Sequence, residues 1–385
     1  MRLRRSGSAW RTLWLAGVVL AGAVVASGFA QKQKKHEPAL YEANAKVGLA
    51  TRVFHPKAMR NWRGAEQKEL RVIIWYPAVN TSHEVPQFVG PPDAPLFEAG
   101  SAAPNAEFEP LLRKLPMIVL SHATGGSAEQ MAWLGSALAR AGYIAVAVDH
   151  PGNTQPGKLT PEGFALWWER ATDVSNVIDG MLADEEFGKK VDETRIGAAG
   201  FSLGGYTVME LAGARTDVDV LYDHCKQNPE NSMCRTPEMK DAGTPEEMLQ
   251  QVRKTSRESL ARSADSFRDP RVKAVFSIAP ALGEVLTPES LRAIRVPVEI
   301  VVGNSDPIAP AEQNADLIER NTHGSRENML PGGVAHYTFL DTCTEQGRKT
   351  MGTYCSDLAG VDRDKVHAQV SDEAVGFFDR ALRVK

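Results

Sequence analysis

The sequence predicts an α/β fold with a mainly parallel central sheet flanked by helices, and three observations lead to it. Short apolar runs recur along the chain and suit strands that are buried on both faces. Amphipathic helix patterns lie between these runs, and such alternation is typical of parallel sheets. The 385 residues are 43% hydrophobic and 24% charged, which fits a globular chain with one large domain and insertions.

The first predicted strand, residues 70–77, is apolar, rich in β-forming residues and ended by Pro77. Proline, glycine and small residues dominate the next stretch, 80–106, which we expect to be a long surface excursion near the entrance of a site. The later predicted strands are 116–121, 144–149, 196–199, 272–278, 298–302 and 327–330. The predicted helices are 128–141, 166–182, 310–320 and a final one at 364–382.

Residues 216–270 interrupt this alternation. They are charged, contain one cysteine pair and include a helical pattern over 245–263. We interpret them as an inserted helical lid. An insertion with no role in catalysis is the alternative.

The first thirty residues have the layout of a secretory signal peptide, with four arginines, an apolar run at 13–26 and small residues to the end. We expect 31–40 to be a flexible tether and 41–385 to be the domain. The protein is therefore predicted to be periplasmic or secreted, with no stable membrane insertion after leader cleavage. An uncleaved leader that anchors the chain in the inner membrane is the alternative, although the run is short for a span of about 20 residues.

The charge balance disfavours nucleic acid as a partner. Loss of the four leader arginines would take the formal net charge from -4 to -8. We expect a small-molecule partner instead.

The four cysteines fall in two close pairs, Cys225 with Cys234 and Cys343 with Cys355. Export makes disulfides plausible, and of the three possible connectivities we favour the two local ones. Zinc binding is the disfavoured alternative, because neither pair has C-x-x-C spacing with histidine partners. No metal site is predicted.

A Gly-x-Ser-x-Gly motif lies at Gly200, Ser202 and Gly204, between the predicted strand 196–199 and a following helix. Such a turn exposes a serine hydroxyl, and bulky side chains at the two glycines would collide with neighbouring backbone. We therefore expect Ser202 to be a nucleophile.

A serine nucleophile needs a base and an acid that orients the base. Asp306 follows the predicted strand 298–302, and His336 lies in a glycine-bearing loop between the last strand and the final helix. These two residues fit the chain order serine, acid, histidine, whereas Asp149 precedes the serine and Asp341 is very close to His336. The other candidate histidines, expected to be on the surface, are His36, His55, His83, His323 and His367.

Donors for the developing anion are expected at two backbone amides, that of Leu203 and that of Thr124 or its neighbour Ala123. The second amide belongs to the glycine-bearing loop 121–126 that follows a predicted strand. His122 in this loop is expected to brace it by hydrogen bonding. His122 and His150, the latter in the strand-end segment 149–154, are also candidates for contact with substrate.

These motifs, together with 72–77 and the segment 336–340, resemble the bacterial α/β-hydrolases known as predicted dienelactone hydrolases, which are similar to the platelet-activating-factor acetylhydrolases. The resemblance covers nearly all of the chain after the leader. It implies the α/β-hydrolase fold, with Ser202 as nucleophile, His336 as base, Asp306 as acid and the two amides as oxyanion hole. True dienelactone hydrolases have cysteine where this chain has Ser202. In the acetylhydrolases the acid follows the preceding strand, where 277–282 here contains no aspartate.

We therefore expect a serine hydrolase that cleaves carboxylic esters of small molecules through an acyl-enzyme on Ser202, without metal or organic cofactor. A peptidase or acyltransferase with the same three residues is the alternative within enzymes. A catalytically silent binding protein with this fold is the alternative outside them. The oligomeric state is not predicted.

Overall fold

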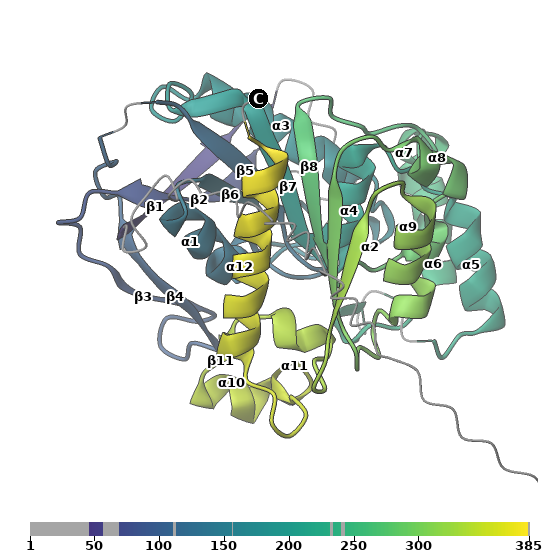
Figure 1. Ribbon diagram of the computed structural model, residues 1–385. Helices are drawn as coiled ribbons and strands as arrows, with labels where there is room; N and C mark the ends of the chain where they lie inside the picture. Colours follow the sequence, from purple (N-terminus) through teal and green to yellow (C-terminus); the bar gives the residue numbers. More distant parts are fainter. Residues whose placement is uncertain are drawn as a thin grey trace, which may run out of the picture. The chain divides into compact units, whose positions relative to one another are not determined.

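The computed structural model describes residues 46–56, 69–110, 113–155, 157–231, 234–239 and 243–383. The predicted leader and tether lie outside these residues. Within them, the prediction of a mainly parallel sheet flanked by helices is confirmed (Figure 1). None of the helices described is both long enough and apolar enough to span a bilayer.

The strands form one sheet in the order β10-β9-β8-β7-β5-β6-β2-β1-β4-β11, with β3 paired to β4. They are β1 (Lys46–Phe54), β2 (Leu70–Ala78), β3 (Val85–Val89), β4 (Phe97–Pro104), β5 (Leu115–Ser121), β6 (Ile144–Val148), β7 (Val191–Phe201), β8 (Val272–Ile278), β9 (Val298–Gly303), β10 (Arg326–Leu330) and β11 (Thr342–Cys343). The strands from β6 to β10 along this order are parallel, and β2 joins them antiparallel.

Parallel pairing places the carboxyl ends of the central strands at one level. Ser121 at the end of β5 is paired with Val148 at the end of β6 and with Gly200 near the end of β7. The loops that follow these strands therefore begin side by side, where α/β sheets place their sites.

The stretch 80–106, which was predicted to be a surface excursion, contains two strands that the sequence analysis did not predict. These are β3 and β4, and β4 pairs with both β1 and β3. The prolines and glycines of this stretch favour loops locally, but Pro86 is tolerated because β3 is an edge strand. Strand β1 was not predicted either.

The helices agree with the predicted ones within a few residues and add several short ones. They are α1 (Ala132–Arg140), α2 (Pro161–Ala165), α3 (Glu169–Ala183), α4 (Leu203–Ala212), α5 (Val218–Gln227), α6 (Pro245–Thr255), α7 (Arg257–Ala261), α8 (Pro288–Ala293), α9 (Ala315–Asn321), α10 (Glu345–Thr350), α11 (Gly352–Cys355) and α12 (Arg363–Ala381). The 3₁₀ helices are η1 (Ala128–Met131), η2 (Pro237–Met239), η3 (Gly283–Val285), η4 (Ala311–Gln313) and η5 (His336–Phe339).

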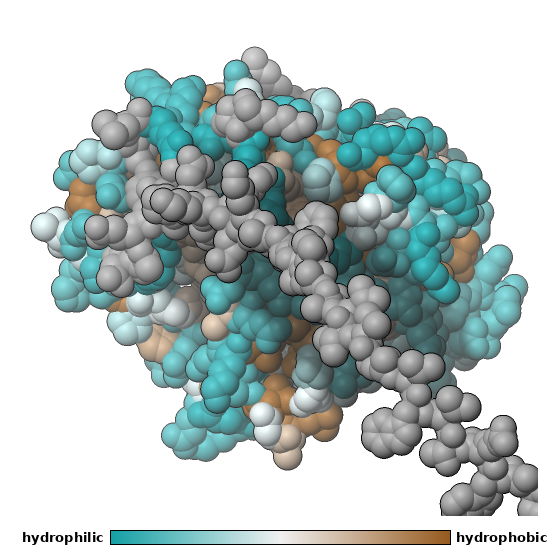
Figure 2. Space-filling model, in the orientation of Figure 1, coloured by the Kyte–Doolittle hydropathy of each residue, from teal (hydrophilic) through white to brown (hydrophobic). Residues whose placement is uncertain are grey.

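The sheet has a hydrophobic core on each face, because successive strand residues point to opposite sides. In β2, Val72 and Ile74 belong to the core that packs on α3 and α4, whereas Ile73 and Trp75 belong to the core under α1 and α12. Figure 1 shows α12 in front of the sheet and α4 behind it. The hydrophobic side chains are mostly buried, and the face in Figure 2 is accordingly mostly hydrophilic with small separate brown patches.

The insertion, residues 216–270, consists of α5, η2, α6 and α7 in its described part. A disulfide joins Cys225 at the end of α5 to Cys234, as the favoured local pairing predicts. Helix α6 begins with a capping box, in which Thr244 and Glu247 each bind the backbone N–H of the other.

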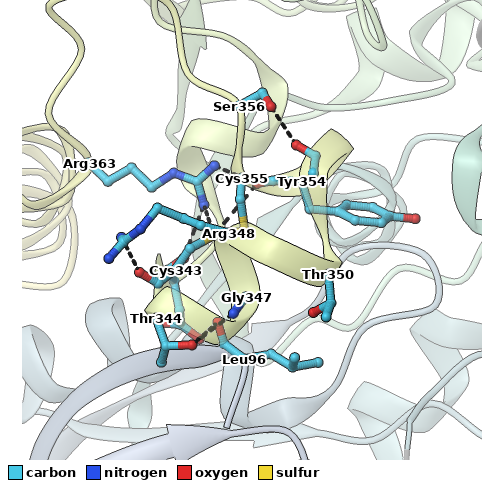
Figure 3. Close-up of a disulfide and its surroundings, with 12 residues drawn as sticks. Leu96, Cys343, Thr344, Gly347, Arg348, Thr350, Tyr354, Cys355, Ser356 and Arg363 are labelled. Atoms are coloured by element: carbon cyan, nitrogen blue, oxygen red, sulfur yellow. Dashed lines mark hydrogen bonds between the residues drawn. A yellow bond between two sulfur atoms is a disulfide. The ribbon is translucent and has the colours of Figure 1, made fainter. Parts of the chain in front are cut away.

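The second local disulfide, between Cys343 and Cys355, closes the segment that contains α10 and α11 (Figure 3). The Thr344 hydroxyl donates to the carbonyl oxygen of Leu96, and the Arg363 guanidinium donates to that of Tyr354. This segment is thereby fastened both to the start of β4 and to the first turn of α12. The ring of Tyr354 packs against that of Tyr337, the residue after His336, with the ring centroids 4.8 Å apart.

Candidate active site

Ser202 lies in a tight turn between β7 and α4, with φ 57° and ψ −117°, a strained conformation for a residue with a side chain. The turn leaves no room at the neighbouring glycines. A Cβ at Gly204 would lie 1.9 Å from the carbonyl oxygen of Ser121, and one at Gly200 would lie 2.2 Å from that of Gly204. Gly204 is thus required by the close approach of the start of α4 to the end of β5, and Gly200 by the approach of the same helix start to the end of β7.

The structure brings Ser202, His336 and Asp306 together although 134 residues separate the first two. His336 Nδ1 lies 2.6 Å from Asp306 Oδ2, and His336 Nε2 lies 2.8 Å from Ser202 Oγ. An ionised carboxylate can only accept, so Nδ1 carries the proton and Nε2 is left to accept from the serine hydroxyl. This arrangement can move a proton from Ser202 to His336 while Asp306 steadies the ring.

The carboxylate of Asp306 is kept ionised despite its burial. Burial alone would raise its pKa, but the electrostatic interaction with the His336 ring, the hydrogen bond from that ring and two backbone amides outweigh burial and hold the pKa below the ordinary value. Those amides belong to Ile308 and Ala309, and each donates to Oδ1 at 2.8 Å. The carboxylate therefore has one oxygen fixed by backbone and the other free to orient His336.

The predicted anion donors lie in two elements beside Ser202. Leu203 is the first residue of α4, and the amides of a helix's first turn have no acceptor within the helix. Ala123 and Thr124 line the same cavity as Ser202. Their part in catalysis stays a prediction.

His122 and His150 do not lie where substrate contact would require. Both are fully buried, and neither lines the cavity. His122 braces its loop as expected: Nδ1 binds the carbonyl oxygen of Ala123 at 2.6 Å, and Nε2 accepts from the amide of His150 at 3.3 Å. Burial, with the nearby Arg170, lowers the pKa of His122 well below its ordinary value, so the ring is neutral. Direct contact with substrate is therefore corrected to an internal role.

His150 belongs to a second serine, histidine and aspartate arrangement. Its Nε2 lies 2.9 Å from Ser121 Oγ, and its Nδ1 lies 2.8 Å from Asp173 Oδ2. Ser121 and His150 have no exposed surface, Asp173 has 2%, and none of the three lines the cavity. Ser202 lines the cavity and Ser121 does not, so only the first arrangement is open to a ligand.

Arg170 on α3, which sequence reasoning missed, supports the strand-end loops from inside the protein. This guanidinium is 1% exposed and donates to the carbonyl oxygen of His122 and, at 3.2 Å, to Asn153 Oδ1. The strand-end segment 149–154 was singled out in the sequence and could have pointed to Asn153. Nothing in the local pattern of α3 distinguishes Arg170 from a surface arginine.

Neither of the alternative acids is hydrogen-bonded to His336. Asp149 accepts from the amide of Ala128 and pairs with Arg71. Asp341 is fully buried, and its two carboxylate oxygens have no hydrogen-bond partner among the described residues.

His367, expected at the surface, is in fact buried. It stacks on Trp133 with ring centroids 4.5 Å apart, and its Nε2 lies 3.1 Å from the carbonyl oxygen of Thr338. The amphipathic pattern of α12 places this ring on the helix face that packs against the rest of the protein. His55, His83 and His323 are exposed, as predicted; His36 lies outside the described residues.

Ser202 and His336 lie at the wall of a cavity of about 1020 Å³. Several parts of the chain contribute to this wall, among them loop 123–127, residues 159–167, the insertion, residues 88–97 and residues 350–354. The insertion supplies Leu221, Tyr222, Glu238, Met239 and Met248. This placement favours the lid interpretation over an insertion remote from the site. The described residues contain no cluster of three or more histidine, cysteine, aspartate or glutamate side chains suited to a metal ion.

Comparison with known proteins gives three results. A family model described as the alpha/beta hydrolase family matches residues 118–343, more than half of the chain. Lipase 1 of Moraxella sp. (strain TA144) is 31% identical over 86 residues, which are 22% of this chain and 24% of the lipase. The chain thus matches about a quarter of that relative's length. A ferulic acid esterase from Streptomyces cinnamoneus is similar in structure, with a TM-score of 0.60 and 22% identity over 90% of this chain and 92% of the other. At this identity the likeness shows the fold alone.

Proposed function

The chain belongs to the alpha/beta hydrolase family, and from this premise we propose that it is a serine hydrolase that cleaves carboxylic esters through an acyl-enzyme on Ser202. One observation carries the proposal: the hydrogen-bonded series from Ser202 through His336 to Asp306 lies at the wall of a large cavity. The closer resemblance to the predicted dienelactone hydrolases stays a prediction.

In the first half of the reaction, His336 Nε2 takes the proton of Ser202 as Oγ attacks the ester carbonyl. The amides of Leu203 and Thr124 donate hydrogen bonds to the carbonyl oxygen, where negative charge develops. His336, now charged, is stabilised by Asp306 and gives its proton to the departing alkoxide. The alcohol leaves, and the acyl group remains on Ser202.

In the second half, water takes the place of the alcohol. His336 removes a proton from water as it attacks the acyl-enzyme, and returns that proton to Ser202 as the acid is released. Asp306 stays ionised through both halves, because two backbone amides and His336 hold its pKa below the ordinary value against the effect of burial.

Ester cleavage is favoured over amide cleavage by the two similar proteins, which are named a lipase and an esterase. The cavity wall is made largely of apolar and aromatic side chains, which suits a small organic ester.

Labelling with a fluorophosphonate probe tests the proposal, because only an activated serine reacts with it. Peptide mapping should find the label on Ser202. The Ser202→Ala variant should take up none, and the Ser121→Ala variant should still be labelled at Ser202. A label on Ser121, or full labelling of Ser202→Ala, would contradict the assignment. The absence of any label on the folded wild-type protein would favour a silent binding protein.

A second comparison separates the alternatives within enzymes. Matched ester and amide substrates with the same acyl group, assayed in water and with added alcohol, should show hydrolysis of the ester only. Preferred cleavage of the amide would favour a peptidase, and transfer to the alcohol an acyltransferase.

A further inference from the structure

The charged side chains of the cavity wall are all acidic in the part of the chain that the structure describes. Glu129 and Glu238 line the cavity, and no described lysine or arginine does. Glu129 pairs with Arg71, so its charge is offset. Glu238 forms no ion pair with any lysine or arginine of the described residues, and its carboxylate accepts a hydrogen bond from Tyr337.

Glu238 lies between two loops of the active site, the loop that carries His336 and the loop that carries the expected anion donor Thr124. It is carried by η2, just after the cysteine that closes the first disulfide. Its Oε1 accepts a hydrogen bond from the hydroxyl of Tyr337, 2.9 Å away, and Tyr337 is the neighbour of His336. On its other side, a Cβ added to Gly125 would lie 3.4 Å from the Cβ of Glu238. The insertion thus brings this carboxylate between the histidine loop and the loop of the expected anion donors.

The negative charge of Glu238 contributes to the raised pKa of two neighbouring tyrosines. Burial raises the pKa of Tyr337, and the charge and hydrogen bonding of Glu238 raise it further. Burial likewise raises the pKa of Tyr354, with a smaller contribution from the same carboxylate. Any anionic group bound nearby would meet the same field.

The rest of the wall does little to screen this charge. It is largely aromatic and aliphatic, with contributions from Phe88, Phe97, Phe164, Trp167 and Tyr222. Apolar walls lower the effective dielectric constant, so a repulsion between two like charges is stronger there than in water. An ester that carries a second, anionic group would also lose its hydration without gaining a cation.

Given the proposed ester hydrolysis, on which this inference rests, we propose that the cavity accepts uncharged esters and rejects esters that carry a carboxylate, and that Glu238 is the specificity-determining residue. The insertion then takes part in substrate selection as well as in covering the site.

Two nearly isosteric aryl acetates that differ in charge test the proposal: 4-acetoxybenzamide, which is neutral, and 4-acetoxybenzoate, which is anionic. The wild-type protein should have the higher kcat/KM for the neutral ester. Glu238→Gln keeps an oxygen that accepts from Tyr337 but removes the charge. It should raise the ratio of kcat/KM for the anionic ester to kcat/KM for the neutral ester about tenfold.

Two further variants isolate the charge. Glu258→Gln makes the same change at an exposed position of α7 outside the cavity wall and should leave the ratio of the two kcat/KM values unchanged. Tyr337→Phe removes the hydrogen bond and keeps the carboxylate, so it should also keep the wild-type ratio. An unchanged ratio in Glu238→Gln would overturn the proposal, as would a parallel loss on both esters, which would place Glu238 in the support of the histidine loop.

The failure of the proposed function would look different. If Ser202→Ala still hydrolysed the neutral ester, the nucleophile would be wrong whatever the charge ratio. If Ser202→Ala were inactive and the ratio did not respond to Glu238, only the selection by charge would fail.

Discussion

The side-chain oxygen Oδ1 of Asn153 accepts a hydrogen bond from the backbone nitrogen of Gly125, which lies 3.0 Å away. The same oxygen accepts from the buried Arg170, and Asn153 Nδ2 donates to the hydroxyl of Thr124 at 3.2 Å. The loop after β6 therefore fixes the backbone of the loop after β5, which carries the expected anion donor Thr124.

Asn153→Ala should lower kcat by about 10-fold to 100-fold with little change in KM, because the anion donor is held less firmly in the transition state. Asn153→Asp keeps the oxygen that accepts from Gly125 and should lose less. Steady-state kinetics with a neutral ester, alongside thermal unfolding, measure both effects. A rise in KM with kcat intact would argue that Asn153 shapes the cavity instead.

Asp306→Asn should lower kcat by roughly 10³-fold to 10⁴-fold with the fold preserved. The amides of Ile308 and Ala309 donate to one side-chain oxygen, so the asparagine must turn its NH₂ group toward His336. His336 Nδ1 then has to accept, its proton moves to Nε2, and Nε2 can no longer take the proton of Ser202. Circular dichroism and kinetics of the variant check this expectation, and wild-type kcat would show that another residue orients the histidine.

Glu210 on α4 should make the stability of the protein depend on pH. Burial raises the pKa of this carboxyl to about 8 from an ordinary value of 4.5, although Tyr206 and Thr216 donate to it. The folded state thus keeps a proton that the unfolded chain releases. The stabilisation that this provides is complete below about pH 4.5 and is lost as the pH rises toward 8.

Glu210→Gln is neutral at every pH and removes this dependence. Relative to wild type, its free energy of unfolding should rise by an amount on the order of a few kcal/mol between about pH 5 and about pH 9. Urea unfolding of the two proteins at both pH values measures the difference. Parallel pH profiles would show that Glu210 binds no extra proton in the fold.

Loss of the Cys343–Cys355 disulfide should weaken both the fold and the site. A crosslink between residues 12 apart stabilises a protein by roughly 3 kcal/mol, so the double serine variant should have a lower Tm. Tyr354 lines the cavity and packs on Tyr337, so KM for a neutral ester should rise as well. Unchanged Tm and KM under reducing conditions, with both thiols shown to be free, would contradict this expectation.

Much of the fold and of the candidate site could be predicted from the sequence because the relevant signals are local. A strand, a glycine-flanked serine and a helix follow one another within 196–212, and strand ends are marked by apolar runs that stop at turn residues. Parallel strands bring such ends to one edge, so Ser202, Asp306 and His336 could be expected there from chain order alone.

The sequence by itself therefore determined the layered α/β architecture, the strained turn at Ser202 and the local cysteine pairings. Tertiary structure alone decided that His150 is hydrogen-bonded to Ser121 inside the protein and that Arg170 supports the strand-end loops. It also decided that Glu238 is hydrogen-bonded to Tyr337, 99 residues away in the sequence. The physical reason is that turns and periodic burial depend on neighbouring residues, whereas the partner of a buried polar group depends on how distant segments pack.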